Sequence, residues 1–385
     1  MLIINAHIVP VEGSELQNGF LRFADGKITE MGSMDELSFL EGEEFYDAEG
    51  RSLYPGFIDA HCHLGMWEDG LGFEGDDGNE ESDPSTPQLR AVDAVNPMDR
   101  CFGEAARGGV TTVLTGPGSA NPIGGQWVAM KTSGRRIDDM LLTDNAGMKF
   151  ALGENPKTVY HDKNLAPNTR MATAAIIREQ LKKAQRYMKD LEDAAADEEL
   201  DEPEYDSKCE ALLPVLRREK KAFIHCHRAD DIFTAIRIGR EFNLDYVIVH
   251  CTEGWMVADM LQEEGVQAIC GPILCDRSKP ELRNLNVGGM AEMHRKGMEM
   301  ALCTDHPVIP IQYLPLCAGI AAGAGLPWEE ALKSITINAA RIAGIDSRVG
   351  SLVPGKDADF TLYSTDPFLP YSKPDKVFIL GKEVV

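Results

Sequence analysis

Short apolar runs alternate with amphipathic, helix-like stretches through the middle of this 385-residue chain. Such alternation is typical of a parallel β-sheet whose strands are joined by crossover helices. The runs predicted as strands are Phe57–His61, Val110–Thr115, Met148–Gly153, Ala222–His225, Tyr246–His250, Val266–Cys270 and Glu299–Thr304. One more run, Gln126–Met130, follows its predecessor too closely for a helical crossover, so its place stays open. The pattern favours an α/β fold, a (β/α)8 TIM-like barrel.

The two ends of the chain have a different pattern. Residues 1–55 alternate apolar and polar positions around turns such as Ala24-Asp25-Gly26, which predicts short antiparallel strands. The same pattern returns near the C-terminus. We therefore expect residues 1–55 and 350–385 to form one small domain, a β-sandwich, and residues 56–349 to form the barrel.

Two insertions interrupt the predicted barrel. Glu68–Gln88 is rich in Gly, Asp, Glu, Ser and Pro and follows the first strand, where active-site loops of such barrels lie. It is either a lid or a solvated acidic loop, and its composition favours the loop. Met171–Asp206 predicts a long, charged, exposed helix that ends in an acidic linker, without evident chemistry.

Composition narrows the classes of function. The formal net charge of −24 repels phosphate backbones and anionic lipid, so we expect no nucleic acid and no membrane as partner, but a small-molecule substrate. No stretch approaches the roughly 20 apolar residues that span a bilayer, and the first residues lack the basic start of a signal peptide. Nine scattered cysteines suit free thiols in a reducing compartment. We expect a cytoplasmic protein.

The first predicted barrel strand ends in a His-x-His motif. Side chains alternate along a strand, so His61 and His63 share one face while Cys62 points to the other. In a parallel barrel, the inner face at a strand's carboxyl end opens on the active-site mouth. The two imidazoles are therefore placed to bind one metal ion.

The same arrangement recurs further along the chain. His225 and His227 form a second pair, His250 ends the next strand, and Asp305 follows the last one. A lone histidine at a strand end is usually structural, but here histidines and a carboxylate from four strands are expected to converge. Nitrogen and oxygen donors of this kind suit a divalent ion, zinc first, or iron or manganese.

A bridging ligand for a second ion has two candidates. Glu154 stands just past a predicted strand end, where its carboxylate could join two metals, although a surface glutamate at a helix start is an equally good interpretation. Lys149 competes, because a lysine carboxylated by carbon dioxide presents the same two oxygens. Glu154 is preferred because it lies at the rim with the other ligands, and one or two ions per chain are expected.

These motifs resemble those of the metal-dependent amidohydrolase superfamily, specifically its imidazolonepropionase-related branch. The resemblance extends over nearly the whole chain, from Pro55-Gly56-Phe57-Ile58-Asp59-Ala60-His61-Cys62-His63 to Gly355-Lys356-Asp357-Ala358-Asp359. It implies a homodimer, and Asp305 as the proton shuttle. The metal ligands that it implies are His61, His63, His225, His250 and Asp305.

One departure from the family concerns specificity. Imidazolonepropionases carry His-Ala-Asp-Glu where this chain has His225-Cys226-His227-Arg228, so a glutamate that assists their chemistry is absent. This argues against imidazolonepropionase activity itself. The charge of Arg228 indicates instead a carboxylate or phosphate on the substrate.

The function predicted is a metal-dependent hydrolase that cleaves a carbon–nitrogen bond of an amide or cyclic amide. A divalent ion lowers the pKa of bound water to about 7, Asp305 moves the proton to the leaving nitrogen, and His250 is a further catalytic candidate. His227 and Arg228 are expected to orient substrate or stabilise the oxyanion. The alternatives are a dipeptidase of the prolidase type, a heterocycle deaminase and a non-catalytic barrel that binds a small molecule.

Overall fold

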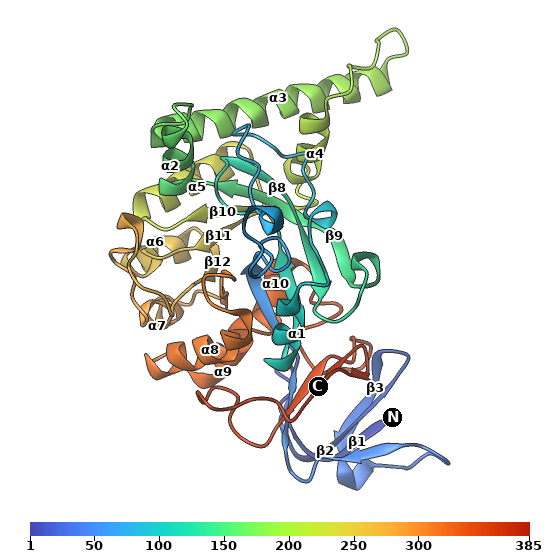
Figure 1. The fold of residues 1–385 in the computed structure, drawn as a ribbon. Coiled ribbons are helices and arrows are strands. Elements are labelled where there is room, and N and C mark those ends of the chain that lie inside the picture. Colours follow the sequence, from blue (N-terminus) through green and yellow to red (C-terminus); the bar gives the residue numbers. More distant parts are fainter.

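The computed structural model describes residues 1–385 and contains two eight-stranded sheets. One sheet forms the barrel in the middle of the molecule, and the other lies at the end that carries both termini (Figure 1). The barrel sheet follows chain order from β6 to β13. Its strands are β6 (Phe57–Cys62), β7 (Val110–Thr115), β8 (Ile123–Lys131), β9 (Leu141–Ala151), β10 (Lys221–Cys226), β11 (Tyr246–His250), β12 (Gln267–Cys270) and β13 (Met300–Leu302).

The first and last strands of this sheet meet and nearly close it into a barrel. Just beyond β6 and β13, the His63 N–H donates to the His306 carbonyl at 2.9 Å, and the Asp305 N–H donates to the His61 carbonyl at 3.2 Å. These bonds bring the carboxyl ends of the two strands to one rim. The expected TIM-like barrel is therefore confirmed in outline.

The barrel differs from a regular (β/α)8 barrel at one strand. The run around Gln126–Met130 is part of β8, which pairs antiparallel with both β7 and β9. Only residues 116–122 connect β7 to β8, and a parallel return needs a crossover of a dozen or more residues. The short connection therefore forces the chain to run back, and the other strands remain parallel.

Helices cover the outside of the barrel (Figure 1). Alternate residues of the strands belong to two apolar clusters: Phe223, Val249 and Ala301 join the inner one, and Ile224 and Ile248 join the outer one against the helices. The helices are α1 (Arg100–Arg107), α2 (Glu154–Asp162), α3 (Arg170–Ala196), α4 (Ser207–Leu216), α5 (Ala229–Glu241), α6 (Ala258–Glu263), α7 (Gly289–Arg295), α8 (Leu314–Gly323), α9 (Trp328–Ser334) and α10 (Ile337–Ala343). None of them combines the length and apolar character needed to cross a bilayer.

Short 3-10 helices complete the regular structure. They are η1 (Met34–Glu36), η2 (Gly72–Gly75), η3 (Ala91–Asp93), η4 (Ile137–Asp139), η5 (Gly254–Val257), η6 (Pro280–Leu282) and η7 (Ile311–Tyr313). Two of them, η2 and η6, lie in loops that reach the site described below.

The long helix expected around Met171–Asp206 is present as α3, followed by an acidic linker and then α4. Thr169 caps its start by accepting a hydrogen bond from the Ala172 N–H at 3.1 Å. The helix is not exposed all round, because Ile177 and Leu181, four residues apart, are buried on one face. It extends at the end of the molecule opposite the termini (Figure 1).

The second sheet joins the two ends of the chain, because β5 pairs antiparallel with β14. Its order is β16-β15-β14-β5-β1-β2-β3, with β4 also paired to β1. It is one continuous mixed sheet, since β1 pairs parallel with β4 and β5, and the hydrogen bonding shows no separate second sheet of a sandwich. Its strands are β1 (Leu2–Ile8), β2 (Leu16–Ala24), β3 (Lys27–Ser33), β4 (Phe45–Asp47), β5 (Ser52–Pro55), β14 (Phe360–Tyr363), β15 (Lys376–Ile379) and β16 (Lys382–Glu383).

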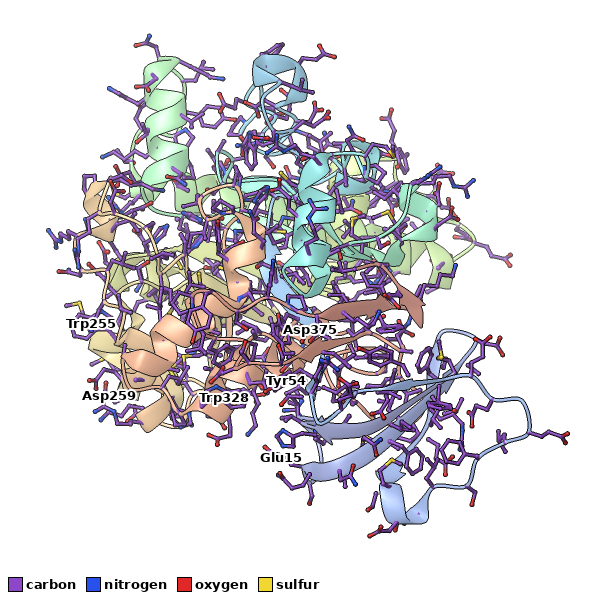
Figure 2. The ribbon with its side chains drawn as sticks, turned by 60° about the horizontal axis from the view of Figure 1, so that its bottom comes forward. Glu15, Tyr54, Trp255, Asp259, Trp328 and Asp375 are labelled. Atoms are coloured by element: carbon purple, nitrogen blue, oxygen red, sulfur yellow. The ribbon has the colours of Figure 1, made fainter.

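Aromatic contacts and ion pairs join this sheet to the barrel. Figure 2 shows Tyr54 of β5 beside Trp328 of α9, with ring centroids 6.1 Å apart. Deeper in the junction, the buried Lys131 at the end of β8 pairs with Asp357 at 2.9 Å and also with Asp359. Burial alone would raise the pKa of Asp357, but the charge of Lys131, with further hydrogen bonds, lowers it. The closing Gly-Lys-Asp-Ala-Asp motif is therefore part of this junction.

Candidate metal centre

Two groups of side chains that suit a metal ion meet at the carboxyl ends of the barrel strands. His61, His63 and Asp305 form the first group, and the second consists of His225, His227 and His250; within each, the ligand atoms lie within 4.8 Å of one another. The rings of His61 and His250 have centroids 5.1 Å apart, so the groups are neighbours. The structure therefore brings together residues that the sequence separates by more than 200 positions.

The first group is built around the carboxylate of Asp305. Its Oδ1 lies 3.0 Å from His61 Nε2 and 3.3 Å from His63 Nε2. The Nδ1–H of His63 donates to the Gly116 carbonyl at 2.7 Å, which leaves the lone pair on Nε2. The His61 ring stacks on Trp127 with centroids 4.4 Å apart, and this holds the ring in place.

The second group is fixed in a similar way. The Nδ1–H of His250 donates to the Gly271 carbonyl at 2.7 Å, and His227 Nδ1 is hydrogen-bonded with the Thr252 hydroxyl at 2.7 Å. The rings of His227 and His250 stack nearly parallel, with centroids 4.5 Å apart. His250 therefore presents Nε2 with its lone pair toward the site.

Unusual backbone conformations accompany these positions. His250 and Asp305 have φ angles of 73° and 55°, in the left-handed region that residues other than glycine seldom occupy. The turn at His250 breaks the alternation of β11, in which Val247 and Val249 face the inner cluster. Strain of this kind, where a strand ends at a cluster of polar side chains, is typical of functional sites.

Burial decides which of these groups are charged. It lowers the pKa values of His61, His225 and His227 well below 6.5 and that of His250 to about 4, so these rings are neutral at pH 7. Burial opposes the ionisation of Asp305, but the neighbouring His250, together with the close ring nitrogens of His61 and His63, holds its pKa well below the usual range. The site therefore combines neutral imidazoles with one carboxylate.

Lys149 lies close to the same place. It comes from β9 and is fully buried, its Nζ has no hydrogen-bond partner, and this atom lies 4.8 Å from the centroid of the Trp127 ring. Burial lowers its pKa from 10.5 to about 7. An amine of this kind is partly unprotonated at neutral pH and able to react.

Glu154 does not join either group. It begins α2, where its Oε2 accepts a hydrogen bond from the Glu281 N–H at 3.2 Å and its own N–H donates to Glu281 Oε2 at 3.1 Å. The cause is a turn at Gly153, whose φ of 84° carries the chain from β9 into the helix. Glu154 lines the cavity described below, but the preference for it as a bridging ligand is not supported.

The two residues expected to bind substrate are also placed differently. Arg228 pairs with Asp230, two residues further on, through contacts of 2.9 Å and 2.8 Å. His227 belongs to the second group, and neither side chain lines the cavity. The structure thus gives no support for a substrate contact by Arg228.

A cavity of about 540 Å³ opens over the two groups. His63, His225 and Asp305 form part of its wall. Asn79 and Glu81 of the acidic insertion also line it, so this loop lies over the site. The Gly118 N–H donates to the Gly78 carbonyl at 2.8 Å, and the Ala120 N–H donates to Asn79 Oδ1 at 3.1 Å, which ties the loop to the segment after β7.

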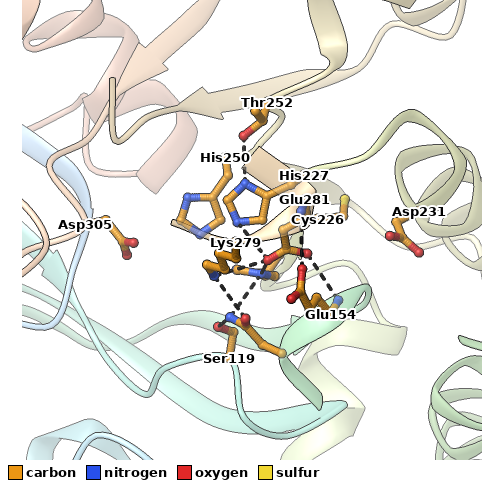
Figure 3. A network of polar contacts seen from close by, with 12 residues as sticks. Ser119, Glu154, Cys226, His227, Asp231, His250, Thr252, Lys279, Glu281 and Asp305 are labelled. Carbon is orange, nitrogen blue, oxygen red and sulfur yellow. Dashed lines mark hydrogen bonds and ion pairs between the residues drawn. The ribbon is translucent and has the colours of Figure 1, made fainter. Parts of the chain in front are cut away.

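Sequence reasoning missed two charged residues of this site. Glu281 is buried, and its Oε1 lies 3.5 Å from His227 Nε2 and 3.1 Å from Lys279 Nζ (Figure 3). Burial raises its pKa, although the charge of Lys279 acts in the opposite direction. Both residues lie in the loop that follows β12. Loops at the carboxyl ends of barrel strands build the active site, and this position is the feature of the sequence that could have indicated them.

The residues present fit a divalent cation. Nitrogen and oxygen donors from separate strands face one another, and His63 and His250 are oriented by their second ring nitrogens. Both ring nitrogens of His61 and Nδ1 of His225 are buried without a hydrogen bond, a state that a bound cation would relieve at any nitrogen it contacts. Cys62 and Cys226 carry buried thiols, whose pKa values burial raises, so thiolate ligation is disfavoured.

Comparison with known proteins identifies a family for this chain. Residues 206–384 match the model of the Amidohydrolase family. A crystal structure of an amidohydrolase from Thermotoga maritima MSB8 is 40% identical and superposes with a TM-score of 0.95, over 100% of this chain and 99% of that one.

Two curated relatives are more distant. Amidohydrolase tasK from Hapsidospora irregularis is 30% identical over 87% of this chain, which spans only 36% of the length of tasK. An imidazolonepropionase from Solibacter usitatus (strain Ellin6076) is 25% identical over 92% of this chain and 86% of its own length. The chain therefore belongs to the amidohydrolase family, as a hydrolase related to the imidazolonepropionases.

Proposed function

We propose that the protein is a metal-dependent hydrolase that uses water to cleave a carbon–nitrogen bond in a small amide or cyclic amide, other than an ordinary peptide bond. One observation carries the proposal. Two groups of metal-type ligands, with His61 and His250 as neighbours, meet beside a cavity large enough for a small substrate. A structural metal site would be closed by four local ligands, commonly cysteines, whereas this one borders an open cavity.

Within this proposal, one or two divalent ions are held by residues of both groups. Zinc is the first choice, and iron or manganese are the alternatives. When bound, such an ion polarises a carbonyl group and makes water acidic enough to react at neutral pH. The residues assigned as its ligands are His61, His63, His225, His250 and Asp305.

We assign the bridging role between two ions to a carboxylated Lys149 instead of Glu154. The amine of Lys149 is buried without a partner beside the Trp127 ring on which His61 stacks, whereas Glu154 is held by Glu281. Addition of the amine to carbon dioxide forms an N–C bond and releases a proton. The product is an anion with two oxygens, which suits a place that would otherwise bury an unpaired ammonium.

Asp305 is the proton shuttle of the proposed reaction. It accepts a proton from the attacking water and delivers it to the nitrogen that leaves. Its Oδ1 lies 3.0 Å from His61 Nε2 and 3.3 Å from His63 Nε2, so these three atoms would face a shared cation. Since Asp305 also lines the cavity, a substrate bound there is within its reach.

The proposal is tested by measuring metal content and activity together. The purified protein is analysed for bound metals and then assayed against cyclic amides, N-acyl amino acids, dipeptides and amino-heterocycles, before and after chelation. We expect one or about two ions per chain, loss of hydrolysis on chelation, and recovery with zinc or manganese. Activity that survives complete removal of metal would contradict the proposal.

A further inference from the structure

Lys279 is the one lysine or arginine among the residues that line the cavity. Its Nζ lies 3.0 Å from Asn155 Oδ1 and 3.1 Å from Glu281 Oε1. An ammonium group carries three hydrogens, so these contacts fix its position and leave one hydrogen for another acceptor. The side chain is about one-third exposed, at 34%, so a ligand in the cavity can reach it.

The position of Lys279 relates it directly to the candidate metal centre. Asn155, which accepts from Lys279, has its Nδ2 3.5 Å from His225 Nε2, and Glu281 Oε1 lies 3.5 Å from His227 Nε2 (Figure 3). The ammonium is therefore separated from the second histidine group by single side chains. A substrate whose reacting amide lies against that group would bring a neighbouring substituent beside Lys279.

Ser119 supplies a second donor at the same wall. Its hydroxyl oxygen accepts a hydrogen bond from Asn155 Nδ2 at 2.6 Å, so its own hydrogen is free to be donated. Asn155 thus connects Lys279 and Ser119 into one row of donors. Two donors side by side suit the two oxygens of a carboxylate.

The acidic residues of the cavity limit the charge that it can accept. Glu81 pairs with Lys163 at 2.8 Å, Glu154 accepts from the Glu281 backbone, and Asp305 faces the histidines of the first group. The wall carries three carboxylates and one ammonium, and Glu281 also lies 3.1 Å from that ammonium. The cavity therefore disfavours a doubly charged phosphate, and Lys279 is the one place on its wall for a single negative charge.

We propose that Lys279, with Ser119, binds a carboxylate of the substrate, so that the preferred substrates are amides with a free carboxylate next to the scissile bond, such as N-acyl amino acids. This inference rests on the proposed hydrolytic function and names its substrate class. The anionic group of the substrate, which the sequence analysis expected Arg228 to bind, is thereby assigned to Lys279. Lys279 is in this sense a specificity-determining residue.

The test compares matched substrates. Metal-loaded wild type and Lys279→Met are assayed on each hydrolysed N-acyl amino acid and on the same compound with its carboxylate converted to the carboxamide. We expect the wild type to prefer the acid, and Lys279→Met to lose roughly 10–100-fold in kcat/KM on the acid and little on the carboxamide. Lys296→Met, which removes an exposed lysine outside this cavity, should keep the wild-type preference.

An equal loss on acid and carboxamide would overturn the inference, because it would mean that Lys279 only holds Glu281 in place. Calorimetric titration of the metal-loaded proteins with propionate and propionamide provides a readout that needs no turnover. We expect propionate affinity to fall about tenfold or more in Lys279→Met. If no amide is hydrolysed, the proposed function fails, while the titration still decides on Lys279: equal propionate affinity in both proteins would overturn its role.

Discussion

Asp59 and Thr304, 245 residues apart in the chain, are joined by a buried hydrogen bond from the threonine hydroxyl to the carboxylate. The same carboxylate accepts from the Thr304 N–H at 3.3 Å and from the His61 N–H at 3.2 Å. The first and last barrel strands are thus held together one residue before Asp305 and two residues before His61. Asp59 positions both metal-type residues without lying among them.

We predict that Asp59→Ala destabilises the protein by about 2–3 kcal/mol, because it leaves buried N–H groups without an acceptor. Bound metal should fall in parallel, since His61 and Asp305 lose their common support. Thermal unfolding and metal analysis measure the two effects. Thr304→Ser, which retains the hydroxyl, is the control and should be close to wild type; full metal retention in Asp59→Ala would exclude the positioning role.

We predict that Asp305→Asn loses activity by a factor of at least about 100, because an amide cannot accept and return a proton. Steady-state kinetics on the best amide substrate, together with metal analysis, measure this loss. Some metal should remain through the histidines. Asp346→Asn alters an exposed aspartate and should behave as wild type. Turnover within a few-fold of wild type in Asp305→Asn would remove it from proton transfer.

We predict that Lys149→Met lowers the metal content from about two ions per chain to about one, whereas Glu154→Gln leaves it unchanged. The reason is that Lys149, and not Glu154, has its functional group free inside the site. Metal analysis of both variants gives the comparison. In wild type, ¹³C-labelled bicarbonate should produce a carbamate signal that is absent from Lys149→Met. The reverse pattern, with loss only in Glu154→Gln, would restore the glutamate as the bridge.

We predict that Lys131→Met destabilises the protein by about 3–5 kcal/mol, because the buried Asp357 and Asp359 lose the ammonium between them. Lys27 also pairs with Asp357 but is 44% exposed, so Lys27→Met should cost below about 1 kcal/mol. Denaturant unfolding of both variants tests the difference. Similar losses for the two lysines would show that burial does not govern the strength of this junction.

The lowered pKa of Asp357 predicts that the stability of the protein depends on pH. The folded-state pKa of Asp357 is lowered below 3.8, so its contribution to stability is complete above that pH and is lost as the pH falls through the folded value. The difference in unfolding free energy between wild type and Asp357→Asn should therefore shrink in acid. A difference that stays constant from pH 7 down to pH 3 would contradict the assignment.

Much of the barrel could be predicted because parallel strands in a barrel produce continuous apolar runs, and His-x-His at the end of such a run fixes which side chains share a face. The direction of β8 could not, since apolar content alone does not distinguish a parallel strand from an antiparallel one. The short link before Ile123 was the clue, and its meaning follows from the reach of a crossover.

The candidate site was predictable where residues stand on strands and less so where they stand on loops. His225 follows the alternation of β10, but His250 reaches the site through a left-handed backbone that the alternation does not predict. Lys279 and Glu281 lie on a loop whose path depends on contacts with Asn155 and Glu154. Such contacts join segments more than 100 residues apart, and no local pattern in the chain contains them.

The strand β8 contacts both the candidate metal centre and the junction with the terminal sheet. Its middle carries Trp127, on which the His61 ring rests, and its last residue is Lys131, seated against Asp357. A shortened protein of residues 56–349 would keep the strand but lack Asp357 and Asp359. The ammonium of Lys131 would then have lost both of these carboxylate partners. We therefore expect the barrel to need the terminal segments in order to fold.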